Sequence, residues 1–140
     1  MSHDRQVNER PELRSIRLRY VRARRVERIL RRPHDLANDA LLVVLEWGPA
    51  ARVPESWRLE QRQPKENASR REAALAEAHE VTHAAYELTA PAWPPDRREI
   101  AGEVDRVSQA ARSALAARYP HLDRASMRRA VSQANYAHAK

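Results

Sequence analysis

Cysteine and phenylalanine are absent from this chain of 140 residues, and glycine occurs only at Gly48 and Gly102. Without cysteine there can be no disulfide, no thiolate zinc site and no cysteine nucleophile, so a metal would need His, Asp or Glu ligands. Two isolated glycines also exclude a glycine-rich loop that cradles phosphate.

Long hydrophobic runs are missing as well. The longest, from Ala40 to Leu45, is far shorter than the roughly 20 residues that a membrane-spanning helix needs. The first residues, MSHDRQVNERPEL, do not contain the apolar stretch of a signal peptide. A chain of this length is typical of about one domain with one modest core. We therefore expect a single-domain cytoplasmic protein that makes no contact with membranes.

Acidic residues are scarce in the first 33 residues. Eleven arginines face four acidic residues there, which gives +7, whereas residues 34–140 carry 15 basic and 15 acidic residues. This asymmetry predicts an anionic partner, of which nucleic acid is the commonest, because arginine makes forked hydrogen bonds to phosphate. The predicted anion-binding residues are Arg14, Arg17, Arg19, Arg22, Arg24, Arg25, Arg28, Arg31 and Arg32.

Two observations limit that prediction. Arginine has a high helix propensity, so the segment could equally be a solvated helix in a protein rich in arginine. Tyr20 is the only aromatic residue in the segment, which argues against recognition of a single nucleic-acid strand. A protein assembly therefore remains an alternative partner.

Prolines separate the chain into helix-sized segments, and the first of these lies between Pro11 and Pro33. One helical face would collect its apolar residues Leu13, Ile16, Tyr20, Ala23 and Leu30. Ile16, Leu18 and Tyr20 also alternate with arginine, as they would in a half-buried strand. We expect a helix over residues 21–32, and residues 14–20 stay open between helix and strand.

The next segment allows two interpretations. Asp35 is a typical N-cap and Gly48-Pro49 a typical stop, which together predict a helix. Val43 and Val44 favour β structure, so a buried strand over residues 41–47 is the alternative. One or two short strands within residues 14–47 are thus compatible with the pattern. Residues 49–68 are expected to be irregular, with about one helical turn.

Three helices are predicted in the second half of the chain. Ser69 and Glu72 have the spacing of a capping box for the first, which would end near residue 90. Asp96 would cap the second and Asp123 the third. The residues expected to be buried are Ala74, Leu75, Ala78, Val81, Ala85 and Leu88, then Ile100, Val104, Val107, Ala111 and Leu115, then Met127, Ala130, Val131 and Ala134.

These patterns predict a mainly α protein, namely a small helical bundle with a C-terminal helical hairpin and a final helix. Residues 1–33 would form its basic segment and residues 34–140 its helical domain. The three tryptophans, Trp47, Trp57 and Trp93, lie at predicted helix ends or in linkers. Because the chain has no phenylalanine, we expect them to anchor loops to the core, with an exposed partner-binding tryptophan as the alternative.

The segment from His79 to His83 reads HEVTH. Side chains four residues apart on a helix can both reach one metal ion, and the intervening Glu80 could then take a proton from metal-bound water. Glu103 is a candidate third ligand. His83 and Glu103 each lie seven residues from the predicted turn, so in an antiparallel hairpin both would lie about 10 Å along their helices.

At these residues the chain resembles the thermolysin-like gluzincin peptidases over about residues 76–105. Their active-site helix carries His-Glu-x-x-His, often with Thr and Ala where this chain has Thr82 and Ala84, and their third ligand is a Glu on the next helix. The resemblance implies His79, His83 and Glu103 as zinc ligands and Glu80 as the catalytic base. The competing interpretation is a helix edge where the histidines pair with Glu80 or Glu87 or face water.

Two functions follow. The first is a small helical binding or assembly protein whose arginine-rich segment contacts an anionic partner, with no cofactor expected. The second is a zinc-dependent peptidase. The peptidase would require a sheet built from residues 14–47 and packed against the HEVTH helix, which distinguishes the two hypotheses.

Overall fold

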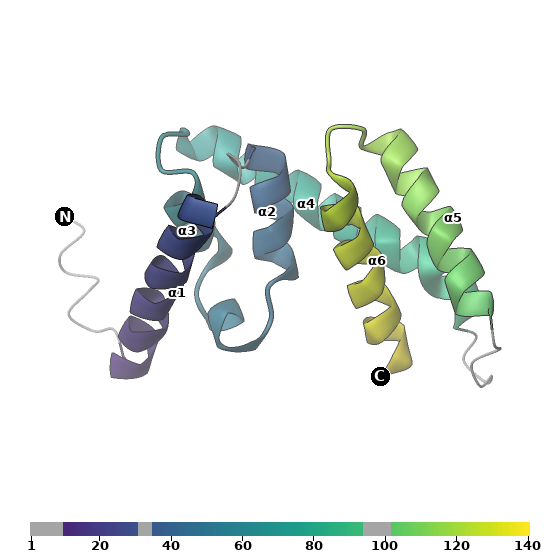
Figure 1. The fold of residues 1–140 in the computed structure, drawn as a ribbon, viewed down its shortest axis with the longest axis horizontal. Coiled ribbons are helices and arrows are strands. Elements are labelled where there is room, and N and C mark those ends of the chain that lie inside the picture. The colour runs from purple at the N-terminus through teal and green to yellow at the C-terminus, as the bar shows by residue number, and fades with distance from the viewer. Residues whose placement is uncertain (1–9, 31–34, 94–101) are drawn as a thin grey trace.

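The computed structural model describes residues 10–30, 35–93 and 102–140 (Figure 1). These residues form α1 (Pro11–Leu30), α2 (Leu36–Leu45), α3 (Glu55–Arg62), α4 (Ala68–Thr89), α5 (Glu103–Arg118) and α6 (Arg124–Ala139), with short 3₁₀ helices η1 (Gly48–Arg52) and η2 (Ala90–Ala92). No strand occurs among them, so the predicted mainly α fold is confirmed. Residues 14–20, for which the sequence allowed a helix or a strand, lie in α1. Of the second such segment, residues 41–47, residues 41–45 lie in α2. None of the described helices is long and apolar enough to cross a membrane.

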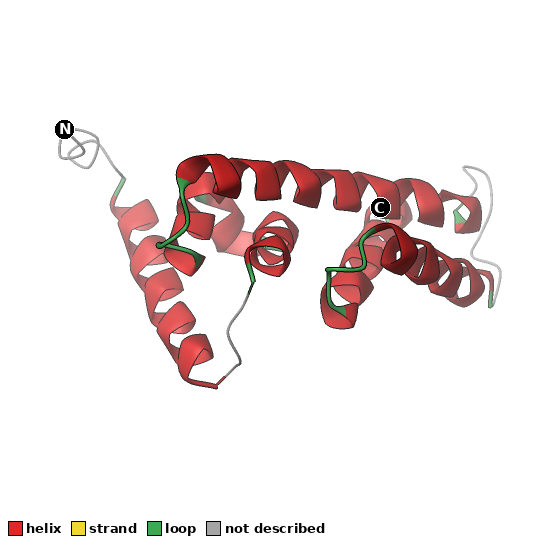
Figure 2. Ribbon diagram, turned by 90° about the horizontal axis from the view of Figure 1, so that it is seen from above, coloured by secondary structure: helices red, strands yellow, loops and turns green. Residues whose placement is uncertain are grey.

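Helix α4 is the long element along which the others are arranged. In Figure 1 it lies behind the other helices, with α1 and α3 near one of its ends, α5 near the other, and α2 and α6 between. Figure 2, seen from above, shows the same layering, with α4 along one edge of the molecule. The fold is therefore a layer of helices packed across one long helix.

The core lies where α2, α5 and α6 meet α4. Its largest fully buried side chains include Leu41 and Leu45 of α2, Val81 of α4 and Leu115 of α5. All four residues predicted to face inward from α6 are buried, as are Ala78, Val81, Ala85, Ala111 and Leu115. The prediction was wrong for Leu88, which is 38 % exposed near the end of α4. Ile100 lies outside the described residues.

Helices α2 and α6 run side by side in the same direction. Asp35 caps α2 by accepting from the Asn38 amide at 2.8 Å, and the Asn38 side chain accepts from the Asp123 amide at 2.9 Å. At the other end, Gln133 Nε2 donates to the Leu45 carbonyl at 2.5 Å. The starts of the two helices are thus tied to each other, and the last turn of α2 is fixed against the middle of α6.

The predicted N-cap is wrong for α4 and confirmed for α6. Ser69 was wrong as the cap of α4, since Asn67 takes that role by accepting from the Arg70 amide at 2.8 Å. Asparagine caps as well as serine does, and it comes two residues earlier. Asp123 does cap α6, with the Ser126 amide 2.8 Å away. The predicted cap Asp96 lies outside the described residues, in which α5 begins at Glu103.

The segment between α2 and α4 is more ordered than expected. Instead of one turn it contains η1 and the eight-residue helix α3.

The three tryptophans differ from one another in their exposure. Trp57 and Trp93 are half-buried, and Trp93 Nε1 donates to Asn135 Oδ1 at 2.9 Å, whereas Trp47 is 78 % exposed. The expectation of a core anchor was therefore wrong for Trp47.

Candidate functional site

Helix α1 is attached to the rest of the molecule through one face of its first half. Ile16 is buried, and one turn later Tyr20 donates from its hydroxyl to Glu46 Oε1 at 2.8 Å. Arg62 Nε donates to the same hydroxyl at 2.9 Å. The Tyr20 and Trp57 rings are tilted with centroids 6.2 Å apart. The predicted apolar face of this helix is thus the docking face, and Tyr20 is its central anchor.

The groups around Tyr20 form a nearly dry cluster of charges. Arg62 lies 3.6 Å from Asp39 and 3.5 Å from Glu46, and Arg58 lies 3.7 Å from Glu46. Two guanidinium groups therefore face two carboxylates, which balances the charge of a site that water hardly reaches. Burial is the main reason that the pKa of Tyr20 rises to about 12, so its hydroxyl stays protonated and donates to Glu46.

Arg58 has a further structural role at the end of α2. Its Nη1 donates to the Val43 carbonyl and its Nε to the Val53 carbonyl, both at 2.9 Å. The last carbonyls of a helix have no partner inside that helix, and a cation there also interacts favourably with the helix dipole. The sequence predicted no role for Arg58 or Arg62 beyond their charge. Their partners, Asp39 in α2 and Glu46 directly after it, lie more than ten residues away along the chain.

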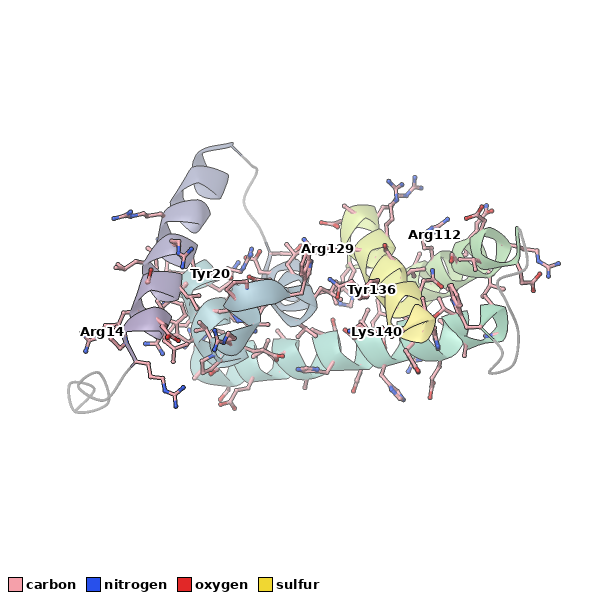
Figure 3. The ribbon with its side chains drawn as sticks, turned by 90° about the horizontal axis from the view of Figure 1, so that it is seen from below. Arg14, Tyr20, Arg112, Arg129, Tyr136 and Lys140 are labelled. Carbon is pink, nitrogen blue, oxygen red and sulfur yellow. The ribbon has the colours of Figure 1, made fainter. Side chains whose placement is uncertain are left out.

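The outer face of α1 is basic. Arg14, Arg19 and Arg22 are exposed, as is Leu18, while Arg17 is half-buried with its guanidinium 4.8 Å from the centre of the Trp57 ring. Figure 3 shows Arg14 on the outer side of α1 and Tyr20 on the side of the other helices. Of the other predicted anion-binding residues, the side chains of Arg24, Arg25, Arg28, Arg31 and Arg32 lie outside the described part of the chain.

The position of α1 makes this face accessible. Among the described elements it packs chiefly against η1 and α3. In Figure 2 its C-terminal half extends away from α4 and from the other helices. Docking through Ile16 and Tyr20 thus leaves a basic helix that a partner can approach from more than one side.

The HEVTH residues lie in the middle of α4, where their ring nitrogens contact carboxylates. His79 Nε2 is 2.7 Å from Glu55 Oε2 of α3, and His83 Nε2 is 3.0 Å from Glu87 Oε1 one turn further along α4. The two histidine side chains are 56 % and 74 % exposed. Glu80 is exposed as well. The pairing of His83 with Glu87 is the arrangement expected of a solvated helix edge.

The described residues do not complete a metal site at this motif. Glu103 accepts from Arg106 Nη2 at 2.6 Å, and it does not combine with His79 and His83. Throughout the described ranges, no group of three or more His, Asp or Glu side chains could hold a metal ion. The sheet that the peptidase hypothesis requires is also absent from residues 14–30 and 35–47, which contain α1 and α2. Within the described residues, His79 and His83 therefore have no third ligand with which to hold zinc.

Sequence analysis missed one feature of the surface. Residues 124–140 contain no acidic residue but three arginines and Lys140, and the exposed Tyr136 lies among them. The absence of acidic side chains from a whole helix was the signal that could have revealed this second basic region.

Comparisons of the chain with protein-family models, with curated proteins and with solved structures gave no match.

Proposed function

We propose that this protein is a small helical binding protein whose helix α1 contacts an anionic partner, and that the partner is nucleic acid. The observation that carries the proposal is the one-sided attachment of α1. Ile16 and Tyr20 hold the helix in place, so the arginines on its other face are presented to solvent in a fixed arrangement. In the cytoplasm, nucleic acid is the most abundant polyanion that such a face would meet.

The physical basis is electrostatic. Arginines that neutralise phosphates release condensed counterions, so the affinity falls steeply with salt concentration. Guanidinium groups also bind phosphate oxygens through two parallel hydrogen bonds. Glu12 is the only acidic residue among the described side chains of α1, so little opposes an approaching phosphate backbone. The peptidase hypothesis is not taken further, because no described residue supplies its third ligand.

The proposal is tested by neutralising two exposed arginines of α1, Arg19→Gln with Arg22→Gln, and measuring binding to a labelled DNA duplex by fluorescence anisotropy. The matched control is Arg106→Gln with Arg118→Gln, which removes the same charge from α5, near the opposite end of α4. Each lost phosphate contact should lower the slope of log affinity against log salt by about 0.9, or roughly two for the pair.

The expected result is a weaker affinity and a lower salt slope for the α1 variant, with both values near wild type for the control. Equal losses in the two variants would show that only net charge matters. No binding of wild type in about 20 mM salt would overturn the proposal and direct attention to a protein partner.

A further inference from the structure

A second basic surface lies on the part of α6 that the core leaves exposed. Arg129, Gln133, Tyr136 and Lys140 follow one another at intervals of four, three and four residues, which places them along one face of a helix. Tyr136 is 68 % exposed, and Lys140 Nζ lies 5.2 Å from the centre of its ring. We call these four residues the α6 stripe.

The hydrogen bond between Gln133 and the Leu45 carbonyl fixes the neighbourhood of this stripe. Gln133 is a member of the stripe, so that face of α6 is turned toward the last turn of α2. Trp47 follows Leu45 by two residues and is 78 % exposed. Trp47 and Tyr136, two of the most exposed aromatic side chains of the described structure, therefore lie within three residues along the chain of the two partners of one hydrogen bond.

Trp47 also connects the α6 stripe to α1. It directly precedes η1, which carries the exposed Arg52 and packs against α1. Figure 1 shows α1, α2 and α6 in that order across the molecule, and Trp47 follows the end of α2. Figure 3, seen from below, shows α1 and α6 on the same side of α4, with Arg14 at one end and Arg129, Tyr136 and Lys140 further along.

We propose that this surface binds single-stranded nucleic acid, with the rings of Trp47 and Tyr136 stacked on unpaired bases and the flanking cations on phosphates. The proposal deepens the proposed function and rests on it for the attraction of phosphate to α1. It supplies the aromatic residues that the N-terminal segment lacks. Exposed rings beside cations suit a single strand, because the faces of paired bases are covered by their neighbours in a duplex.

The positive charge of η1 and α6 and the well-ordered end of α6 both favour the binding of single-stranded nucleic acid. Neither η1 nor residues 124–140 contain an acidic residue, so the charged groups that an approaching phosphate would meet there are cations, among them Arg52, Arg129 and Lys140. The end of α6 is held in place, since the rings of His138 and Tyr86 stack with centroids 3.8 Å apart and His138 Nε2 donates to the Tyr86 carbonyl at 2.8 Å. Tyr136 is therefore presented from an ordered turn, which limits the entropy lost on binding.

The test compares two probes, a labelled 12-nucleotide oligothymidylate and inorganic polyphosphate, which has the charge but no bases. Trp47→Ala and Tyr136→Ala should each weaken oligothymidylate binding by about 5- to 100-fold and leave polyphosphate binding within about twofold. Trp47→Phe and Tyr136→Phe keep a ring and should retain most of the affinity. Both positions changed are exposed, so far-UV circular dichroism should be unchanged.

The outcomes separate the two proposals. Unchanged oligothymidylate binding in both alanine variants, or no binding by wild type, would overturn the stacking proposal. This holds regardless of how strongly the variant Arg19→Gln with Arg22→Gln binds nucleic acid. An equal loss of polyphosphate binding in the alanine variants would overturn the stacking proposal too. Polyphosphate has no bases, so the loss would then come from a change in the fold and not from lost stacking. If the α1 variant binds normally while the alanine variants do not, the role of α1 fails and the stacking surface stands.

Discussion

Replacing Asp39 by asparagine tests whether the charged cluster beneath α1 is as dry as the structure shows. Asp39 lies in α2, its side chain is fully buried, and it faces Arg62 at 3.6 Å. It also accepts from Gln63 Nε2 at 2.8 Å. Asparagine has nearly the same shape and can keep the hydrogen bond from Gln63 through its oxygen, while its amide NH2 takes the place of the carboxylate oxygen that faces Arg62.

The magnitude follows from the charge balance. Two arginines face two carboxylates in wild type, and Asp39→Asn leaves one buried positive charge uncompensated. Removing one partner of a buried ion pair typically costs about 3 to 5 kcal/mol. Arg62 keeps Glu46 at 3.5 Å, which offsets part of the loss. We therefore expect a fall of about 2 to 3 kcal/mol in the free energy of unfolding.

Urea denaturation followed by circular dichroism measures this change, provided that the slope against urea concentration is the same in both proteins. Asp105→Asn is the matched control, because Asp105 is exposed in α5 and its loss should change stability by less than about 0.5 kcal/mol. Combining Asp39→Asn with Arg62→Gln restores the charge balance. The double variant should then lose less than the sum of the two single losses, by about 1 to 2 kcal/mol.

A cost for Asp39→Asn below about 1 kcal/mol would refute the reasoning, since that value is typical of an exposed ion pair. Strictly additive losses of stability in the two single variants and the double variant would refute the reasoning independently, because they would mean that Asp39 and Arg62 do not interact.

Three further predictions concern other parts of the molecule. Because burial raises the pKa of Tyr20 from 10.0 to about 12, the stabilisation from its protonated form is complete below pH 10 and is lost as the pH rises through 12. Over that interval the unfolding free energy of wild type should fall by up to about 2 kcal/mol more than that of Tyr20→Phe, allowing for partial exposure; parallel curves would contradict this. Asn67→Ala should cost about 1 kcal/mol in urea denaturation and Ser69→Ala clearly less, whereas the reverse order would mean that Ser69 caps α4. In zinc titrations followed by calorimetry, the protein should bind no more tightly than two exposed histidines allow, and a submicromolar site lost in His79→Ala with His83→Ala would contradict the structure.

Local features of the sequence were sufficient to predict most of the helices. Asp35 and Asp123 are strong N-caps, and the spacing of Met127, Ala130, Val131 and Ala134 permits one buried face. These signals act over one or two turns, so neighbouring residues contain all the information. Where two local signals competed, as at Asn67 and Ser69, the sequence did not decide between them.

The segment from residue 14 to residue 20 shows where local information ends. Its alternation of apolar residues with arginine fits a strand as well as a helix, and only the pairing of Tyr20 with Glu46 and Arg62 shows which face is buried. These partners lie 26 and 42 residues away along the chain. No pattern within a short window contains contacts at that separation.

The sequence by itself therefore determined the helical class, the basic character of the N-terminal quarter and the exclusion of thiol chemistry, because composition and short-range spacing carry these properties. Only the tertiary structure decided what the side chains do. It pairs His79 with a carboxylate from another helix, buries Arg62 among acids, and leaves Trp47 exposed. Each of these outcomes depends on which helices pack together, and helix packing is set by surfaces that lie far apart along the chain.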